Sequence, residues 1–174
     1  MKEPISIEGY DLLTKEFKFL LEVHKPKVAH EKKVAADQGD RSENAEYHAA
    51  KEKLRFIDKR LFYLNSMIEK SQIIDPSLAP HIKIRFGSSV KLTNIDTDEE
   101  EIYTICGVLE AEPENGLISI HSPLARAMIG KEEGDEFKVK LPNSVKVYEV
   151  EEIFYENIFS LKKNIRDEID FTFH

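Results

Sequence analysis

The turn Gly39-Asp40-Arg41-Ser42-Glu43-Asn44-Ala45-Glu46-Tyr47 separates two amphipathic segments of the chain. After the turn, apolar residues recur at alternating spacings of three and four, with no glycine or proline among them: Tyr47, Ala50, Leu54, Ile57, Leu61, Leu64 and Ile68. Because a repeat of 3.5 residues keeps one stripe facing one partner, this pattern predicts a coiled-coil helix. The turn is too short for this helix to leave the preceding one, so we expect the two to form an antiparallel hairpin.

The segment before the turn is also predicted to be helical. Ser6 is a suitable N-cap, and residues of the predicted seam follow at spacings of three and four: Tyr10, Leu13, Phe17, Leu20 and His24. Pro26 interrupts the pattern, because proline lacks a backbone N–H and usually kinks or ends a helix. We therefore expect one kinked helix, or two closely joined helices, over residues 7–37.

The sequence then predicts a second domain of a different kind. Asp75-Pro76 ends the helical domain of residues 1–75, whose acidic tip spans 37–46, and residues 76–80 form a linker. From residue 81 to 155 the apolar period changes to two, with strand-like segments at 89–93, 102–105, 117–120, 137–141 and 145–150.

Turn and cap signals complete this second domain. Asn115-Gly116 indicates a hairpin turn. Ser122 and Pro123 suit the start of a short helix that stops at Gly130. The predicted fold class is α+β: an antiparallel coiled-coil hairpin, then a small antiparallel sheet with one short helix. Residues 156–174 are predicted to form an amphipathic helical tail.

Composition and charge limit the function classes. Residues 1–75 carry as many basic as acidic side chains, so the net charge of −8 belongs to the rest of the chain. Such an acidic half is a poor surface for duplex nucleic acid. No apolar run approaches the roughly 18–20 residues of a membrane span, and the N-terminus has no apolar signal region, so we expect a cytoplasmic protein. Cys106, the single cysteine, is expected to be a buried structural thiol.

The acidic turn has two interpretations. Asp40 and Glu43 are spaced nearly as in a capping box, and acidic side chains are favoured at a helix start. Alternatively, carboxylates at the end of a hairpin can hold Mg²⁺, which takes one or two protein carboxylates and keeps its waters. Two carboxylates cannot enclose the ion, so such a metal would be shared with another molecule.

The basic residues behind the turn also have two interpretations. Lys51, Arg55 and Lys59 are four residues apart and share one face. This face is either a solvated side of the coiled coil or a track for the backbone of a single nucleic-acid strand. The sequence contains no phosphate-binding glycine loop and no Cys/His metal spacing, which favours a protein that works inside a partner.

Several segments resemble the bacterial GreA/GreB transcript-cleavage factors. The resemblance covers about residues 4–155, and its most specific parts are the turn with its continuation to Glu52 and the segment Ser122-Pro123-Leu124-Ala125-Arg126-Ala127. Residues 47–52 and 129–135 are similar to GreA, whereas residues 39–43 and 55–60 are closer to GreB.

This resemblance implies a C-terminal domain of FKBP-like fold and a coiled coil that enters the secondary channel of RNA polymerase. It implies that Asp40 and Glu43 bind Mg²⁺ and position water, so that the polymerase's own active site cleaves the 3′ end of backtracked nascent RNA. Tip support would come from Arg41, Ser42 and Asn44. The basic patch of Lys51, Arg55 and Lys59 would face the RNA, and Ser122 and Pro123 would dock on the channel rim.

On these grounds we expect a monomeric elongation factor rather than an enzyme with its own active site. One alternative is an inhibitor that binds the secondary channel without cleavage activity; retention of both Asp40 and Glu43 argues against it. A peptidyl-prolyl isomerase is a second alternative, suggested by the fold alone. A purely structural coiled coil is a third, and the globular second domain argues against that.

Overall fold

The computed structural model describes residues 1–40 and 44–161. The chain divides into two compact units, a helical unit of Tyr10–Ser71 and a sheet unit that combines Met1–Gly9 with the chain from Gln72 onward. The predicted domain boundaries stay a prediction. Within the described ranges, no helix has the length and apolar character needed to cross a membrane.

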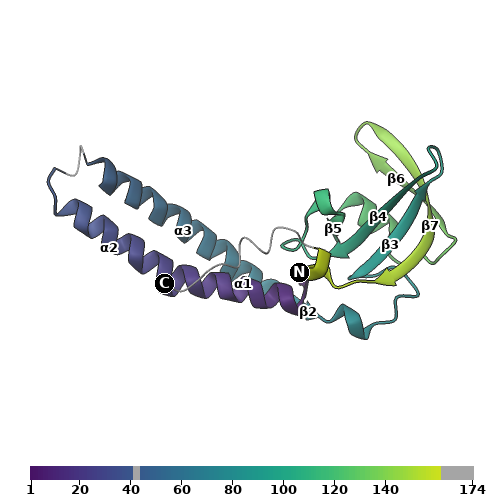
Figure 1. Ribbon diagram of the computed structural model, residues 1–174, viewed down its shortest axis with the longest axis horizontal. Helices are drawn as coiled ribbons and strands as arrows, with labels where there is room; N and C mark the ends of the chain where they lie inside the picture. The colour runs from purple at the N-terminus through teal and green to yellow at the C-terminus, as the bar shows by residue number, and fades with distance from the viewer. Residues whose placement is uncertain (41–43, 162–174) are drawn as a thin grey trace. The chain divides into compact units, whose positions relative to one another are not determined.

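The helical unit is built from two long helical stretches that lie side by side (Figure 1). Its elements in chain order are α1 (Ile7–Phe19), the π-helical turn η1 (Leu20–His24), α2 (Lys25–Ala36) and α3 (Ala45–Lys70). The Lys25 N–H donates to the carbonyl of Leu20, five residues earlier. This spacing is typical of a π-helix, whereas an α-helix has a spacing of four. This turn keeps the chain helical through Pro26, as the sequence predicted for closely joined helices.

Small and aliphatic side chains fill the seam between α2 and α3. The buried members are Val28 on α2 and Ala50, Ile57 and Leu61 on α3. Ion pairs link α3 to both preceding helices: Lys25 Nζ of α2 lies 2.6 Å from Asp58 Oδ1, and Arg60 donates to both oxygens of Glu16 on α1 at 2.7 and 2.9 Å. The predicted heptad therefore faces its partner helix.

The second long helix ends earlier than the sequence predicted. It stops at Lys70 rather than near Asp75, because Ser71–Ile74 forms strand β2 and pairs with strand β1 (Glu3–Ser6). The Ser71 hydroxyl donates to the Met67 carbonyl at 2.7 Å and so caps the last turn. Pairing with a distant strand outweighs the local helical pattern here, a long-range effect that periodicity does not reveal.

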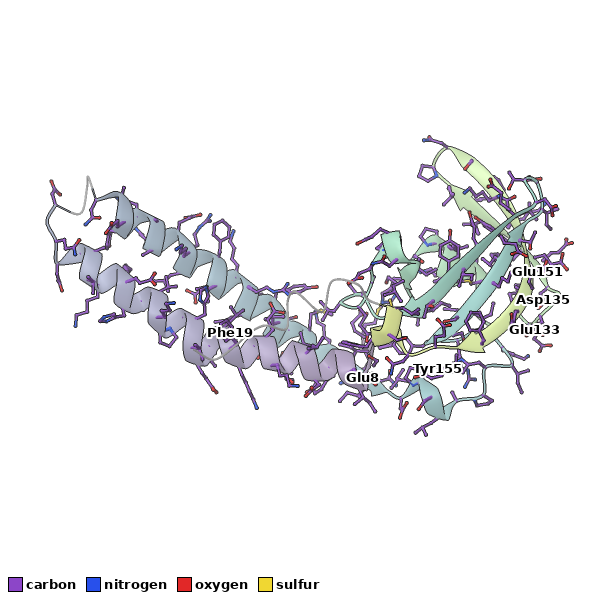
Figure 2. All side chains as sticks on the ribbon, viewed as in Figure 1. Glu8, Phe19, Glu133, Asp135, Glu151 and Tyr155 are labelled. Atoms are coloured by element: carbon purple, nitrogen blue, oxygen red, sulfur yellow. The ribbon has the colours of Figure 1, made fainter. Side chains whose placement is uncertain are left out.

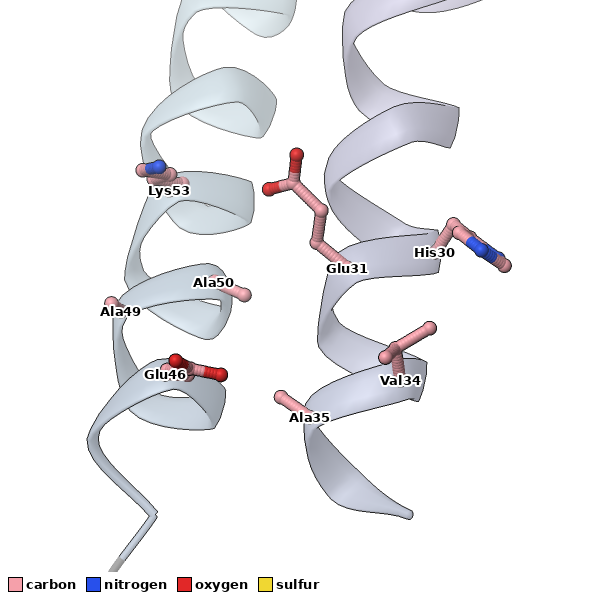
Figure 3. A pocket seen from close by; sticks show the side chains of 8 residues that line it. All are labelled: His30, Glu31, Val34, Ala35, Glu46, Ala49, Ala50 and Lys53. Carbon is pink, nitrogen blue, oxygen red and sulfur yellow. The ribbon is translucent and has the colours of Figure 1, made fainter. Parts of the chain in front are cut away.

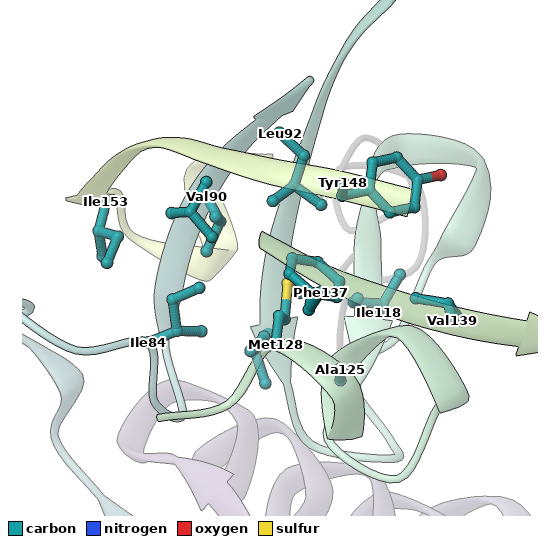
Figure 4. Packing of buried hydrophobic residues seen from close by; sticks show 12 residues of the cluster. Ile84, Val90, Leu92, Ile118, Ala125, Met128, Phe137, Val139, Tyr148 and Ile153 are labelled. Atoms are coloured by element: carbon teal, nitrogen blue, oxygen red, sulfur yellow. The ribbon is translucent and has the colours of Figure 1, made fainter. Parts of the chain in front are cut away.

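The sheet unit contains a five-stranded sheet in the order β5-β4-β3-β7-β6. All five predicted strands are present: β3 (Ser88–Asn94), β4 (Glu99–Cys106), β5 (Leu117–Ser119), β6 (Glu136–Leu141) and β7 (Ser144–Tyr155). The short helix α4 (Pro123–Met128) packs on this sheet, and Figure 4 shows Ala125 and Met128 beside Phe137 of β6. The α+β fold class is confirmed.

One feature of the predicted sheet is wrong: the sheet is mixed, not antiparallel. Strand β5 runs parallel to β4, with Thr104 opposite Leu117. The Asn115-Gly116 turn does reverse the chain, but it pairs Glu112 with Leu117 rather than two long strands. The excursion from residue 107 to 116 returns the chain beside β4 in the same direction. The Asn115-Gly116 turn predicted that the chain reverses, but it did not predict that β5 then pairs with β4.

A smaller apolar cluster lies beside the main core. Cys106 and Leu117 are buried against Ile158 of α5 (Ile158–Leu161), as expected for a structural thiol. Thus the start of the predicted tail is helical, and the rest of that tail, from residue 162, lies outside the described residues.

Candidate functional site: the tip and exposed face of the helix hairpin

The acidic turn lies between the end of α2 at Ala36 and the start of α3 at Ala45. Of the predicted metal ligands, the structure describes Asp40, whereas Glu43 lies outside the described residues. Two of the predicted supporting residues, Arg41 and Ser42, lie outside them as well. The predicted pairing of the Asp40 and Glu43 carboxylates therefore stays a prediction.

Asn44 joins the two helix ends. Its Oδ1 accepts a hydrogen bond from the Tyr47 N–H at 3.0 Å, which makes Asn44 the N-cap of α3. Its Nδ2 donates to the carbonyl of Ala35 in the last turn of α2. One amide thus satisfies a backbone donor of one helix and a backbone acceptor of the other.

This geometry corrects the capping interpretation of the turn. Asp40 is not the N-cap of α3, because the helix begins at Ala45 and the cap position falls on Asn44, whose φ of −85° and ψ of 96° are extended. Asp40 instead lies in the connecting segment, after Gly39, whose φ of +143° is rarely adopted by residues with a side chain. The sequence signal that could have found the cap was Asn44 itself, since asparagine is among the best N-caps.

A shallow hollow of about 420 Å³ lies at this tip, and the described residues that line it are Gln38, Gly39, Asp40, Asn44, Ala45 and Glu46. Among the side chains that the structure describes, no group of three or more His, Cys, Asp or Glu residues could hold a metal ion. The carboxylates of Asp40 and Glu46 suit Mg²⁺ chemically, because this ion is bound through one or two carboxylates and retains waters. The described donors therefore fit part of a magnesium site.

A second hollow of about 410 Å³ separates α2 and α3 just behind the tip. Alanines face each other across it, and Figure 3 shows Glu31 directed toward α3 while His30 points away. The small side chains of Ala35 and Ala50 keep the helices close but fill little space. Apart from these alanines, nothing in the sequence predicted this hollow.

The predicted basic patch lies on the exposed side of α3. Lys51, Arg55 and Lys59 are all exposed. Arg55 is paired with Glu52, with Nη2 2.6 Å from Oε1. The hydrogen bond from Arg55 lowers the pKa of the Glu52 carboxyl, and Glu52 raises the pKa of Arg55. Part of the positive charge of the patch is thus balanced within the helix.

The predicted docking residues start helix α4 in the sheet unit. The Ser122 hydroxyl accepts a hydrogen bond from the Ala125 N–H at 3.2 Å, and Pro123 occupies the first turn with its ring exposed. The preceding residue, His121, has its Nε2 2.7 Å from Glu3 Oε2. Ser122 therefore stabilises the start of α4 as its N-cap. Pro123 is the more exposed of the two residues and so the more accessible to a partner.

Acidic side chains cover much of the sheet unit. Figure 2 labels Glu133, Asp135 and Glu151 among them, and all three are exposed. Each also accepts a local hydrogen bond: from the Ile153 N–H, the Glu132 N–H and the Thr93 hydroxyl, respectively. The negative charge expected from the sequence thus lies at the surface, where it disfavours duplex nucleic acid.

Comparison with known proteins assigns both halves of the chain. Residues 3–73 match the family described as "Transcription elongation factor, N-terminal", and residues 79–155 match "Transcription elongation factor, GreA/GreB, C-term". The chain is 50% identical over 157 residues to transcription elongation factor GreA of Nautilia profundicola, covering 90% of this chain and 97% of that one. It is 53% identical to GreA of a Nitratiruptor species, covering 90% and 96%.

Solved structures of lower similarity were also found. The Thermus thermophilus GreA factor homolog 1 matches with 20% identity and a TM-score of 0.42, covering 88% of this chain and 99% of that one. A GreA/GreB factor from Nitrosomonas europaea matches with 19% identity and a TM-score of 0.40, covering 88% and 100%. From the family matches over both halves and the relatives at about 50% identity, the chain belongs to the GreA/GreB family of transcription elongation factors.

Proposed function

We propose that this protein is a transcript-cleavage factor that acts on bacterial RNA polymerase in the cytoplasm, as a monomer. It stimulates the polymerase's own hydrolysis of nascent RNA and has no complete active site of its own. In a backtracked complex the RNA 3′ end has left the polymerase active site, and cleavage of this end rescues the arrested complex. Family membership over both halves of the chain carries this proposal.

In this mechanism the helix pair enters the secondary channel of the polymerase with the acidic turn leading. Asp40 and Glu43 would hold Mg²⁺ jointly with groups of the polymerase. The chemistry that such an ion would supply is activation of a coordinated water and stabilisation of the charge that develops at phosphorus. The observation that supports a magnesium site at this end is the carboxylate oxygens of Asp40 and Glu46, which line the hollow at the described tip and suit this ion.

Other residues of the chain position the tip and its target. Asn44 fixes where the turn ends and α3 begins, through its hydrogen bonds to Tyr47 and Ala35. The basic patch of Lys51, Arg55 and Lys59 attracts the phosphates of the displaced RNA, an attraction that weakens as salt rises. The exposed Pro123 at the start of α4 docks on the rim of the channel, and Ser122 holds that turn in place.

The experiment that tests this function uses purified RNA polymerase stalled on a template and backtracked by several nucleotides, with RNA labelled at its 5′ end. Adding the protein with Mg²⁺ should shorten the RNA at its 3′ end. Asp40→Asn and Glu43→Gln should each slow this cleavage at least a hundredfold. Asp37→Asn is the matched control, because it changes an acid only three residues from Asp40 and should retain most activity.

The outcomes separate the alternatives. If the parent protein binds the polymerase and blocks its activity without shortening the RNA, the protein is a channel inhibitor instead. If Asp40→Asn and Glu43→Gln fold normally and cleave as fast as Asp37→Asn, the tip has no catalytic part. The lengths of the released fragments distinguish GreA-like from GreB-like cleavage.

A further inference from the structure

Three aromatic side chains of α3 lie in solvent. Phe62 is 80% exposed, Phe56 is 57% exposed and Tyr63 is 40% exposed. On the same helix, Ile57 and Leu61 are buried in the seam and Leu64 is buried as well, so the helix packs on its partner without these three rings. A single exposed apolar residue needs no explanation, but a contiguous group marks an interaction site.

The three rings surround a lysine. Lys59 is three or four residues from each of its neighbours on the helix surface, and residues at these spacings lie next to each other. Those neighbours are Arg55, Phe56, Phe62 and Tyr63. We call the five residues 55, 56, 59, 62 and 63 the aromatic face of α3. It lies about 21 Å from the start of the helix at Ala45, at 1.5 Å per residue.

Cations already cover two of the rings. The Arg55 guanidinium lies 5.4 Å from the centre of the Phe56 ring, and that of Arg60 lies 5.5 Å from the centre of the Tyr63 ring. Both distances are within the range of cation–π attraction. Phe62, the most exposed of the three, is the ring most open to a new stacking partner.

Lys59, at the centre of the aromatic face, favours a nucleic-acid partner over a protein partner. The core of a protein interface is enriched in aromatic residues but depleted in lysine, because an ammonium group is costly to desolvate. A single nucleic-acid strand suits both features, since its phosphates bind cations and its unpaired bases stack on aromatic rings. A duplex offers no free base faces along its sides, so the rings would gain nothing from it.

We propose that the aromatic face of α3 stacks the unpaired bases of the displaced RNA, with Phe62 as the principal stacking ring and Lys59 at the adjacent phosphate. The proposal rests on the proposed function, because it takes the RNA to run along the outside of the inserted helix pair. It adds a base-stacking contact, tolerant of sequence, to the phosphate attraction of the basic patch. Phe62 is thereby a residue that sets affinity for backtracked RNA and takes no part in the chemistry.

Crosslinking tests the contact directly. Phe62 is replaced by the photoreactive p-benzoylphenylalanine, which keeps an aromatic ring, and the full-length protein is bound to backtracked complexes that carry 3′-labelled RNA. The cleavage step is blocked by Asp40→Asn so that the label stays in place. The same probe at Leu21, an exposed position on η1, is the control. We expect label to transfer to position 62 and not to position 21, and crosslinks from position 62 to polymerase subunits alone would overturn the proposal.

Kinetics give a second, independent readout. Base–aromatic stacking contributes about 1–3 kcal/mol per base, so Phe62→Ala should raise the protein concentration needed for half-maximal cleavage about fivefold or more. Phe62→Tyr should retain the parent value, because it keeps a flat ring, whereas Phe62→Leu should resemble Phe62→Ala. The maximal cleavage rate at saturation should be the same for all four proteins.

The two proposals fail in different ways. If the parent protein does not stimulate cleavage at all, the proposed function is wrong. If the parent protein cleaves, and Phe62→Ala requires no more protein than Phe62→Tyr, only the stacking contact is wrong. A loss that is equal for Phe62→Ala and Phe62→Tyr also contradicts stacking, because the latter retains the ring.

Discussion

The helical unit and the sheet unit use apolar side chains in different ways. In the sheet unit, twelve buried residues form one core, to which α4 contributes Ala125 and Met128. The helical unit has a thin seam that includes alanines, a hollow behind its tip, and aromatic rings left in solvent. This difference indicates that the sheet unit is shaped for stability, whereas the helix pair is shaped to present residues to a partner.

The largest expected effect on stability lies in the core of the sheet unit. Leu92 is fully buried there, so Leu92→Ala should lose about 2–5 kcal/mol of unfolding free energy through lost burial and the cavity left behind. Hydrogen exchange measured by mass spectrometry should show faster exchange in β3, β4 and β7. Protection in α2 and α3 should stay unchanged, and equal loss in both units would mean that they unfold as one block.

The second-largest expected effect on stability is at Glu110, a buried residue of the sheet unit. Glu110 is 1% exposed and accepts hydrogen bonds from the Ser6 hydroxyl, the Ser6 N–H and the Gly107 N–H. Glu110→Ala leaves these donors without a partner, which should lower the unfolding free energy by about 1–3 kcal/mol or more. Urea denaturation measures this loss, and the exposed Glu114→Ala is the matched control. A similar midpoint for both variants would show that the carboxylate contributes little.

The tip of the helical unit should respond more weakly. Asn44→Ala removes the N-cap of α3 and should cost about 1 kcal/mol of local stability. Asn44→Asp keeps an acceptor for the Tyr47 N–H but loses the donor to the Ala35 carbonyl. This variant therefore measures the contribution of the α2–α3 hydrogen bond separately from that of the cap. Amide exchange in the first turn of α3 should accelerate most in Asn44→Ala. Unchanged exchange in both variants would show that the cap is not needed there.

Alkaline pH should act mainly on the sheet unit. Burial, with a smaller effect of the Glu101 charge, raises the pKa of Tyr103 to about 12, and burial also raises the pKa of Tyr148. A raised folded pKa means that this stability is fully present below the ordinary tyrosine pKa of about 10 and is lost as pH rises toward 12. In a pH titration, the tyrosinate absorbance of Tyr103 and Tyr148 should therefore appear at higher pH than that of an ordinary tyrosine. Full ionisation of all six tyrosines near pH 10, with the fold intact, would contradict this burial effect.

Much of this organisation could be predicted from local sequence. The strict heptad from Ala50 to Leu64 and the alternating strands depend on neighbouring residues, and both were confirmed. Ser6 and Ser122 act as caps as predicted, because capping chemistry is local too. The α+β class follows from the change of period after residue 80.

Two of the errors involve partners that are distant in sequence, and a third is local to the tip. Helix α3 ends early because Ser71–Ile74 pairs with β1, and β5 runs parallel to β4 because the excursion at 107–116 brings it back there. At the tip, the acidic spacing suggested that Asp40 caps the helix, but Asn44 has that role. The predicted roles of Asp40 and Glu43 stay predictions, since a site completed by a partner leaves its ligands incomplete in the chain alone.

The measurement that tests the central claim most directly is the magnesium dependence of RNA cleavage in backtracked polymerase complexes. The rate is measured at saturating protein over a range of Mg²⁺ concentrations, for the parent protein, Asp40→Asn and Asp37→Asn. If Asp40 helps to hold the ion, Asp40→Asn should need a higher Mg²⁺ concentration for half-maximal rate, while Asp37→Asn should match the parent. An unchanged Mg²⁺ dependence in Asp40→Asn, with or without a lower maximal rate, would contradict the claim that this tip completes the polymerase's metal site.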